Sequence, residues 1–133
     1  MAVVVGFIPT PEGQAALVRG AEEARLRGAG LVVVASYDPL QNPDRAALQR
    51  FRDELAAVEE RLAGAGLDFE VRQMARGRLP SEDILEVAEE LDADLVVIGL
   101  RRRTAVGKLL LGSQAQQVLM DATCPVLCVK AAR

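Results

Sequence analysis

Short apolar runs alternate along the chain with longer segments in which apolar residues recur every three or four positions. The short runs cover residues 3–8, 31–36, 69–74, 95–99 and 126–129. The clearest helical spacing is that of Leu48, Phe51, Leu55, Val58 and Leu62. The resulting order is β-α-β-α-β-α-β-α-β. Such alternation predicts an α/β fold with one parallel sheet, right-handed crossovers and helices on both faces.

Residues that typically begin or end helices flank the periodic segments. Thr10-Pro11-Glu12 combines an N-cap hydroxyl, a proline in the first turn and an acid that faces the positive end of the helix dipole. The same reasoning predicts helix starts at residues 42–44 and 80–83. Glycines at residues 28–30 and 64–66 predict helix ends, because glycine accepts the left-handed cap.

The composition of each short run indicates its place in the sheet. The runs 3–5, 31–34 and 95–98 are continuously apolar, which is typical of strands buried on both faces. The third run carries polar residues, among them Glu70 and Arg72, and we expect it at an edge.

The last run, from Val126 to Val129, is apolar on both faces although it is the terminal strand. An exposed apolar edge invites pairing, so we predict a homodimer through this strand. Two alternatives remain open at this point: the strand lies centrally, or the C-terminal tail covers it.

The length and composition indicate one small domain. The chain has 133 residues and half of them are hydrophobic, with three Phe, one Tyr and no Trp. We therefore expect a single domain, residues 1–133, with an aliphatic core. The net charge of −3 favours no nucleic-acid partner. No apolar run approaches the roughly 18 residues of a membrane span, and residues 1–8 lack the features of a signal peptide, so we expect a cytoplasmic protein.

The residues that most often carry catalysis or bind metals are scarce. There is no His, which removes the commonest general base, the Ser-His-Asp triad and most zinc sites. On one strand, Cys124 and Cys128 would lie about 13 Å apart. A disulfide needs Cα atoms within roughly 7 Å, so we expect free, buried thiols.

Known phosphate-binding and phosphoacceptor motifs do not fit the chain. A P-loop requires Gly-Lys-Ser/Thr, but Gly107-Lys108 is followed by Leu109. Gly6 stands without the Gly-x-Gly-x-x-Gly pattern of a dinucleotide-binding unit. A receiver domain needs acids after its first and third strands, where this chain has Ile8 and Met74. Because no nucleophile-base pair or metal cluster is visible, we expect a protein that is not an enzyme.

The segment 99–113 is the best candidate for ligand binding. It follows the fourth strand, and ligands of open α/β sheets bind at the carboxyl ends of strands. Gly112-Ser113 opens the next helix, where backbone N–H groups and a hydroxyl can hold a phosphate. The positive charge of the segment comes from Arg101, Arg102, Arg103 and Lys108. Without a ligand, Gly112-Ser113 would only begin a helix and the arginines would lie in a solvated loop, and both of these alternatives stay open.

The same segment resembles the nucleotide motif of the universal stress protein family, which reads Gly, two residues, Gly, nine residues, Gly, then Ser or Thr. Gly99, Gly112 and Ser113 fall on three of these places, and Arg102 occupies the place of the second glycine. The chain is similar to the family over nearly its whole length. Further similar segments are Gly77 with Pro80 and Ile84, residues 93–99, residues 109–113 and residues 124–127.

The resemblance implies both a fold and a function. The implied fold is a doubly wound, five-stranded parallel sheet of strand order 3-2-1-4-5, adenine nucleotide alpha hydrolase-like. The implied protein is a dimeric stress-response or signalling module that pairs through its fifth strand. Some members hold ATP at the carboxyl ends of the first and fourth strands, and others bind no nucleotide.

The site that the resemblance implies departs from the family in two places. Members that bind ATP usually have an Asp after the first strand that contacts the ribose, whereas this chain has Ile8. Arg102 replaces a glycine, so its side chain either blocks the phosphate or binds it as a planar fork. The implied nucleotide-binding residues are Pro9, Thr10, Ser36 (through its backbone), Gly99, Arg101, Arg102, Gly112 and Ser113.

Two functional hypotheses follow. In the first, ATP or AMP, with Mg²⁺, biases the loop 100–111 and thereby the surface of the dimer. In the second, the module binds no nucleotide and the dimer recognises partner proteins. The catalysis expected is at most slow ATP hydrolysis or autophosphorylation at Ser113 or Thr104.

Overall fold

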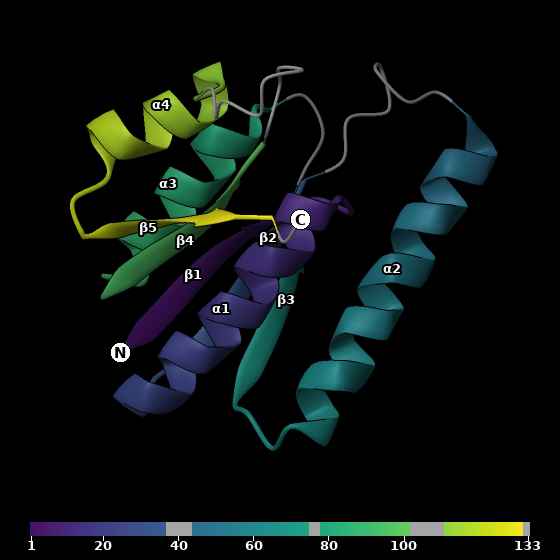
Figure 1. The fold of residues 1–133 in the computed structure, drawn as a ribbon, viewed down its shortest axis with the longest axis horizontal. Helices are drawn as coiled ribbons and strands as arrows, with labels where there is room; N and C mark the ends of the chain where they lie inside the picture. Colours follow the sequence, from purple (N-terminus) through teal and green to yellow (C-terminus); the bar gives the residue numbers. More distant parts are fainter. Residues whose placement is uncertain (37–43, 75–77, 102–110, 132–133) are drawn as a thin grey trace.

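The fold is an open parallel sheet between two layers of helices (Figure 1). The computed structural model describes residues 1–36, 44–74, 78–101 and 111–131. Its elements are β1 (Ala2–Phe7), α1 (Pro11–Arg27), β2 (Gly30–Ala35), α2 (Arg45–Gly64), β3 (Phe69–Gln73), α3 (Pro80–Glu90), β4 (Leu95–Leu100), α4 (Ser113–Asp121) and β5 (Val126–Lys130).

The five strands are parallel and lie in the order β3-β2-β1-β4-β5, which confirms the predicted fold class and strand order. β1 is central, with β2 on one side and β4 on the other. The chain reverses its direction of travel across the sheet between β1 and β4. This switch point is where ligands bind in open α/β sheets.

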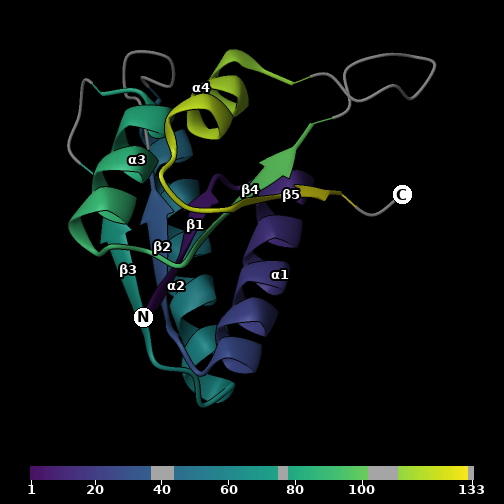
Figure 2. The same cartoon turned by 90° about the vertical axis from the view of Figure 1, so that its left-hand side faces the viewer.

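The helices pair off on opposite faces of the sheet, α1 with α2 and α3 with α4 (Figures 1 and 2). Each face has its own buried cluster. The α1–α2 cluster contains Val3, Val5, Leu31, Val33, Phe51, Leu55 and Val58, and the α3–α4 cluster contains Val4, Val32, Val34, Ile84, Val87, Val96 and Val118. The core is therefore mainly aliphatic, as the composition predicted, with Phe7 and Phe51 as buried aromatic residues.

Most helix boundaries fall where the sequence predicts them. The Thr10 hydroxyl accepts a hydrogen bond from the Gly13 N–H at 3.1 Å, and Gly28 ends α1 with a φ of 63°. The predicted start at residues 42–44 is wrong in detail. The N-cap is Asp44, whose carboxylate accepts from the Ala46 N–H at 3.0 Å, and α2 begins at Arg45. Residues 42 and 43 lie outside the described part of the chain.

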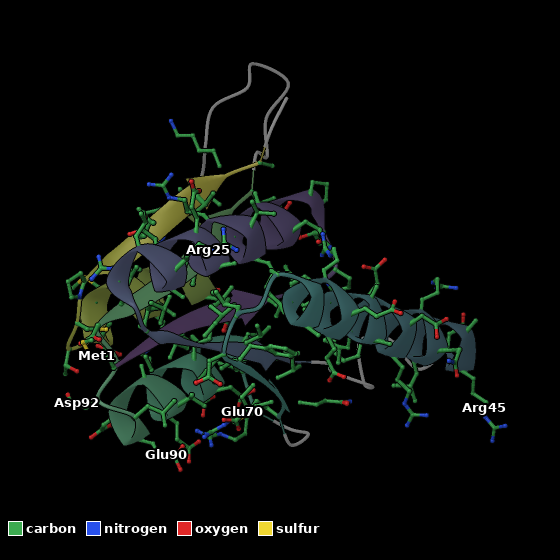
Figure 3. The ribbon with its side chains drawn as sticks, turned by 90° about the horizontal axis from the view of Figure 1, so that it is seen from below. Met1, Arg25, Arg45, Glu70, Glu90 and Asp92 are labelled. Atoms are coloured by element: carbon green, nitrogen blue, oxygen red, sulfur yellow. The ribbon has the colours of Figure 1, made fainter. Side chains whose placement is uncertain are left out.

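The two edges of the sheet differ in character. β3 is at one edge, as predicted, and Arg72 at this edge contacts Glu70 at 2.6 Å and Glu90 of α3 at 2.5 Å. Figure 3 shows Glu70 and Glu90 on the same side of the molecule. β5 is at the other edge, which excludes the central position left open by the sequence. Its residues 126–129 are all partly exposed.

The prediction of buried cysteines is wrong. Cys124 precedes β5 instead of lying on it, and both Cys124 and Cys128 are free and partly exposed. An edge strand is covered by helices on its faces but by no strand on its outer side, so its side chains keep some contact with solvent. None of the helices in the described ranges is both long enough and apolar enough to cross a membrane.

Candidate functional site

A cavity of about 110 Å³ opens at the carboxyl ends of β1, β2 and β4. The arrowheads of these strands and the first turn of α1 lie at the same end of the molecule (Figure 2). The lining residues are Gly6, Phe7, Ile8, Glu12, Gly13, Val34, Ser36, Pro80, Ile84, Ile98, Gly99, Gln114 and Ala115. Ile8, Ser36 and Gly99 therefore share one cavity, as the parallel sheet predicts.

The first turn of α1 packs directly on the end of β4 because residue 99 is a glycine. A Cβ atom added at Gly99 would lie 2.3 Å from the backbone oxygen of Glu12 and 2.6 Å from its carbonyl carbon. Contacts this short do not occur between real atoms, so any side chain here would push α1 away from the sheet. The first glycine of the sequence motif thus has a structural role that requires no ligand.

This close approach places the carboxylate-bearing Glu12 in the cavity wall. Glu12 is 9% exposed, and its side chain forms no hydrogen bond or ion pair with any residue in the described ranges. Its position in the first turn of α1 places it near the positive end of the helix dipole, which offsets part of the desolvation. An acidic residue in the cavity wall that has no donor among the described residues can accept hydrogen bonds from the hydroxyl or amino groups of a ligand.

A second carboxylate lies behind the β2 side of the cavity. The Ser36 hydroxyl donates to Oδ2 of Asp83 at 2.9 Å, and Asp83 is 1% exposed. The other oxygen, Oδ1, is buried without a hydrogen bond, and Nε of Arg78 lies 3.8 Å from it. Asp83 lies in the first turn of α3, so the backbone dipoles also favour its negative charge.

The start of α4 forms the β4 side of the site. Gly112 is the N-cap in extended backbone, with φ of −68° and ψ of 163°. Its added Cβ would meet no atom within 4 Å in the described structure, so packing does not explain this glycine. The next residue but one, Gln114, lines the cavity, and its Oε1 accepts from the Ser81 N–H of α3 at 2.9 Å. The first N–H groups of α4 have no carbonyl partner within the helix and can bind an anion.

The structure brings together only some of the predicted site residues. Ser36 and Gly99 line the cavity, and Gly112 and Ser113 lie next to Gln114 at its border. Pro9 and Arg101 are exposed, and the Thr10 hydroxyl is engaged in capping α1. Arg102 and Thr104 lie outside the described residues.

Three polar residues of the site were missed by sequence reasoning: Glu12, Asp83 and Gln114. Glu12 and Asp83 each sit in the first turn of a helix, where an acid is expected for the dipole alone. Gln114 follows the motif directly, and that adjacency was the available signal. In the described ranges, no three Asp, Glu or Cys residues gather closely enough to hold a metal ion.

Comparison with known proteins gives one consistent result. The family model described as the universal stress protein family matches residues 1–130. A universal stress protein of Mycolicibacterium smegmatis is 42% identical over 130 residues, which cover 96% of each chain.

Solved structures agree with this match. A universal stress protein from Archaeoglobus fulgidus superposes with a TM-score of 0.81 at 34% identity, covering 98% of each chain. The universal stress protein from Archaeoglobus fulgidus in complex with dAMP gives a TM-score of 0.76 at 30% identity, again covering 98% of each chain.

Proposed function

Because the chain belongs to the universal stress protein family, we propose that it is a dimeric stress-response module that binds an adenine nucleotide at the cavity described above. The observation that carries the proposal is a cavity at the switch point of the sheet whose wall includes Glu12, an acidic residue with no hydrogen bond or ion pair to any residue in the described structure. The similar dAMP complex from Archaeoglobus fulgidus supports an adenine nucleotide as the ligand.

The chemistry of the walls supports one orientation of the nucleotide. Apolar side chains, including Val34 of β2 and Ile84 of α3, line the part of the cavity near these two elements and suit the flat faces of a base. The N-terminus of α4 and the exposed Arg101 lie on the β4 side and suit the phosphate. The base is therefore placed toward β2 and the phosphate toward α4.

Glu12 lies between these two ends, where the ribose would sit. Its carboxylate can accept hydrogen bonds from ribose hydroxyls, a role that Ile8 cannot fill. The family's usual Asp after the first strand is thus replaced by an acid one helical turn further along the chain. This placement supports nucleotide binding although position 8 carries no acid.

The cavity volume indicates which part of the ligand is enclosed. At about 110 Å³ it is well below the roughly 300–1,000 Å³ of sites that bury whole ligands. We therefore propose that the base and part of the ribose are enclosed and that the phosphates lie over the start of α4. AMP or ATP fits this arrangement, and Mg²⁺, where present, would bind through the phosphate oxygens.

Calorimetric titration with AMP and with ATP, each with and without Mg²⁺, tests the proposal. Gly112→Ala is the informative variant, because its methyl group meets no described atom but faces the proposed phosphate position. Gly64→Ala at the end of α2 is the matched control, since its added Cβ also meets open space. We expect the wild type and Gly64→Ala to bind equally and Gly112→Ala to bind more weakly.

Absence of binding at millimolar AMP and ATP would contradict the proposal and favour the module that recognises protein partners without a nucleotide. Equal binding by all three proteins would contradict the placement of the phosphate at α4. Phosphate release measured on the same samples tests the expectation that any ATP hydrolysis is slow.

The dimer is proposed through β5. This strand is a sheet edge whose residues 126–129 are partly exposed and mostly apolar, and such an edge favours pairing with another strand. Light scattering after size exclusion should give twice the chain mass of 14.2 kDa. A single species at the chain mass would contradict the dimer but leave the nucleotide site unaffected.

A further inference from the structure

The hydroxyl of Ser36 has a fixed hydrogen-bond polarity. Its oxygen lies 2.9 Å from Oδ2 of Asp83, and a carboxylate can only accept. Nε of Arg78 lies 3.8 Å from the other oxygen of Asp83, Oδ1, and Asp83 lies in the first turn of α3. The single proton of Ser36 is therefore committed to Asp83, and its oxygen has only lone pairs left for a ligand in the cavity that Ser36 lines.

We propose that Ser36 reads the 6-amino group of the bound purine and that Asp83 is the positioning residue that fixes the hydroxyl as an acceptor. This inference rests on the proposed nucleotide site, in which the base lies toward β2. The 6-amino group is the only N–H donor of an adenine base. Hypoxanthine carries a carbonyl at the same position, and its oxygen would face the lone pairs of Ser36 without a proton between them.

Gln114, which lines the cavity from the start of α4, does not provide the same discrimination. Gln114 uses its Oε1 to accept from the Ser81 N–H, so its amide nitrogen is left to donate toward the cavity. The ring nitrogens N3 and N7 are acceptors in adenine and hypoxanthine alike. Gln114 thus suits both bases, and the choice between them falls to Ser36.

The test compares the dissociation constants of AMP, IMP and purine riboside 5′-monophosphate, which has only hydrogen at position 6. The wild type should bind AMP about threefold to tenfold more tightly than the unsubstituted nucleotide, as expected for one hydrogen bond, and IMP most weakly. Ser36→Ala should bind AMP and the unsubstituted nucleotide equally. Ser36→Thr keeps the hydroxyl and should keep the preference.

Asp83→Asn tests the positioning role separately. An amide either accepts from or donates to the Ser36 hydroxyl, so the preference for AMP over IMP should shrink by several-fold. Ratios of dissociation constants do not depend on the fraction of folded protein, so they remain valid if these variants are less stable. A preference that is unchanged in Ser36→Ala or in Asp83→Asn would overturn the assigned role of that residue.

The outcomes of this test separate a failure of the Ser36 inference from a failure of the proposed nucleotide site. If none of the three nucleotides binds the wild type, the proposed function and this inference are both wrong. If all three bind the wild type with equal affinity, the nucleotide site stands and the reading by Ser36 is wrong.

Discussion

Replacing Gly99 by alanine should be among the most damaging single-methyl changes in this protein. The added Cβ would lie 2.3 Å from the Glu12 backbone oxygen, about 1 Å short of an ordinary contact at 3.4 Å. The obstructing atoms belong to the backbone of α1, whose first turn is held by the Thr10 cap. They cannot move aside by a change of rotamer, so the helix or the strand must shift.

The expected magnitude follows from the nature of this clash. Overpacking costs about 1–3 kcal/mol in general, and an immobile backbone neighbour places Gly99→Ala near 3 kcal/mol. This is a large share of the ~5–15 kcal/mol that stabilises a typical domain. For a chain of this length the melting temperature should fall by about 10 °C.

Urea and thermal unfolding of Gly99→Ala and Gly112→Ala measure the effect. Both positions are motif glycines, but the Cβ of Gly112→Ala meets no described atom and its φ of −68° suits any residue. We expect the stability of Gly112→Ala to stay within about 0.5 kcal/mol of the wild type. If Gly99→Ala were as stable as Gly112→Ala, the packing role assigned to Gly99 would be refuted.

Three further results are expected. Thr10→Ala should lower the free energy of unfolding by about 1 kcal/mol through loss of the N-cap, and Thr10→Ser should restore it in urea titrations. Partial burial raises the pKa of Cys124 and of Cys128 above that of an ordinary thiol, so both should react with Ellman's reagent at pH 8 more slowly than free cysteine. Because their folded pKa exceeds the unfolded value, the free energy of unfolding should be unaffected by them below pH 9 and fall as the pH rises further; an increase there would contradict the shift. Ile8→Asp, which restores the family's usual acid, should weaken AMP binding because a second carboxylate would face Glu12 in one cavity, and tighter binding would refute the role of Glu12.

The fold was predictable because local patterns and global topology agree. Continuously apolar runs became β1, β2 and β4 in the interior of the sheet, and the polar third run became the edge strand β3. Where the prediction failed, two local signals competed. Asn42-Pro43 resembles a helix start, but the next residue, Asp44, provides the cap that the structure uses. The apolar composition of β5 left open whether the strand lies centrally or at an edge, and the strand order places it at an edge with residues 126–129 partly exposed.

The candidate site was predictable only as far as sheet geometry reaches. Parallel strands end at one edge, so Ile8, Ser36 and Gly99 could be placed together from the sequence alone. The partner of Ser36 could not be predicted, because Asp83 lies 47 residues further along the chain on a helix that crosses back over the sheet. A first-turn acid such as Asp83 has the same sequence signature whether it caps a dipole or orients a hydroxyl.

An acidic residue that is absent from its usual motif position can be replaced in space by an acidic residue from elsewhere in the chain. By sequence, Ile8 removes the ribose acceptor of the family. In space, the tight contact of Gly99 with α1 places Glu12 in the wall of the same cavity as Ile8. The first turn of α1 can pack this closely only because position 99 has no side chain, so the position of Glu12 in the cavity wall depends on Gly99. The chemistry of the site therefore depends on which groups face the cavity and not on which residue of the motif carries them.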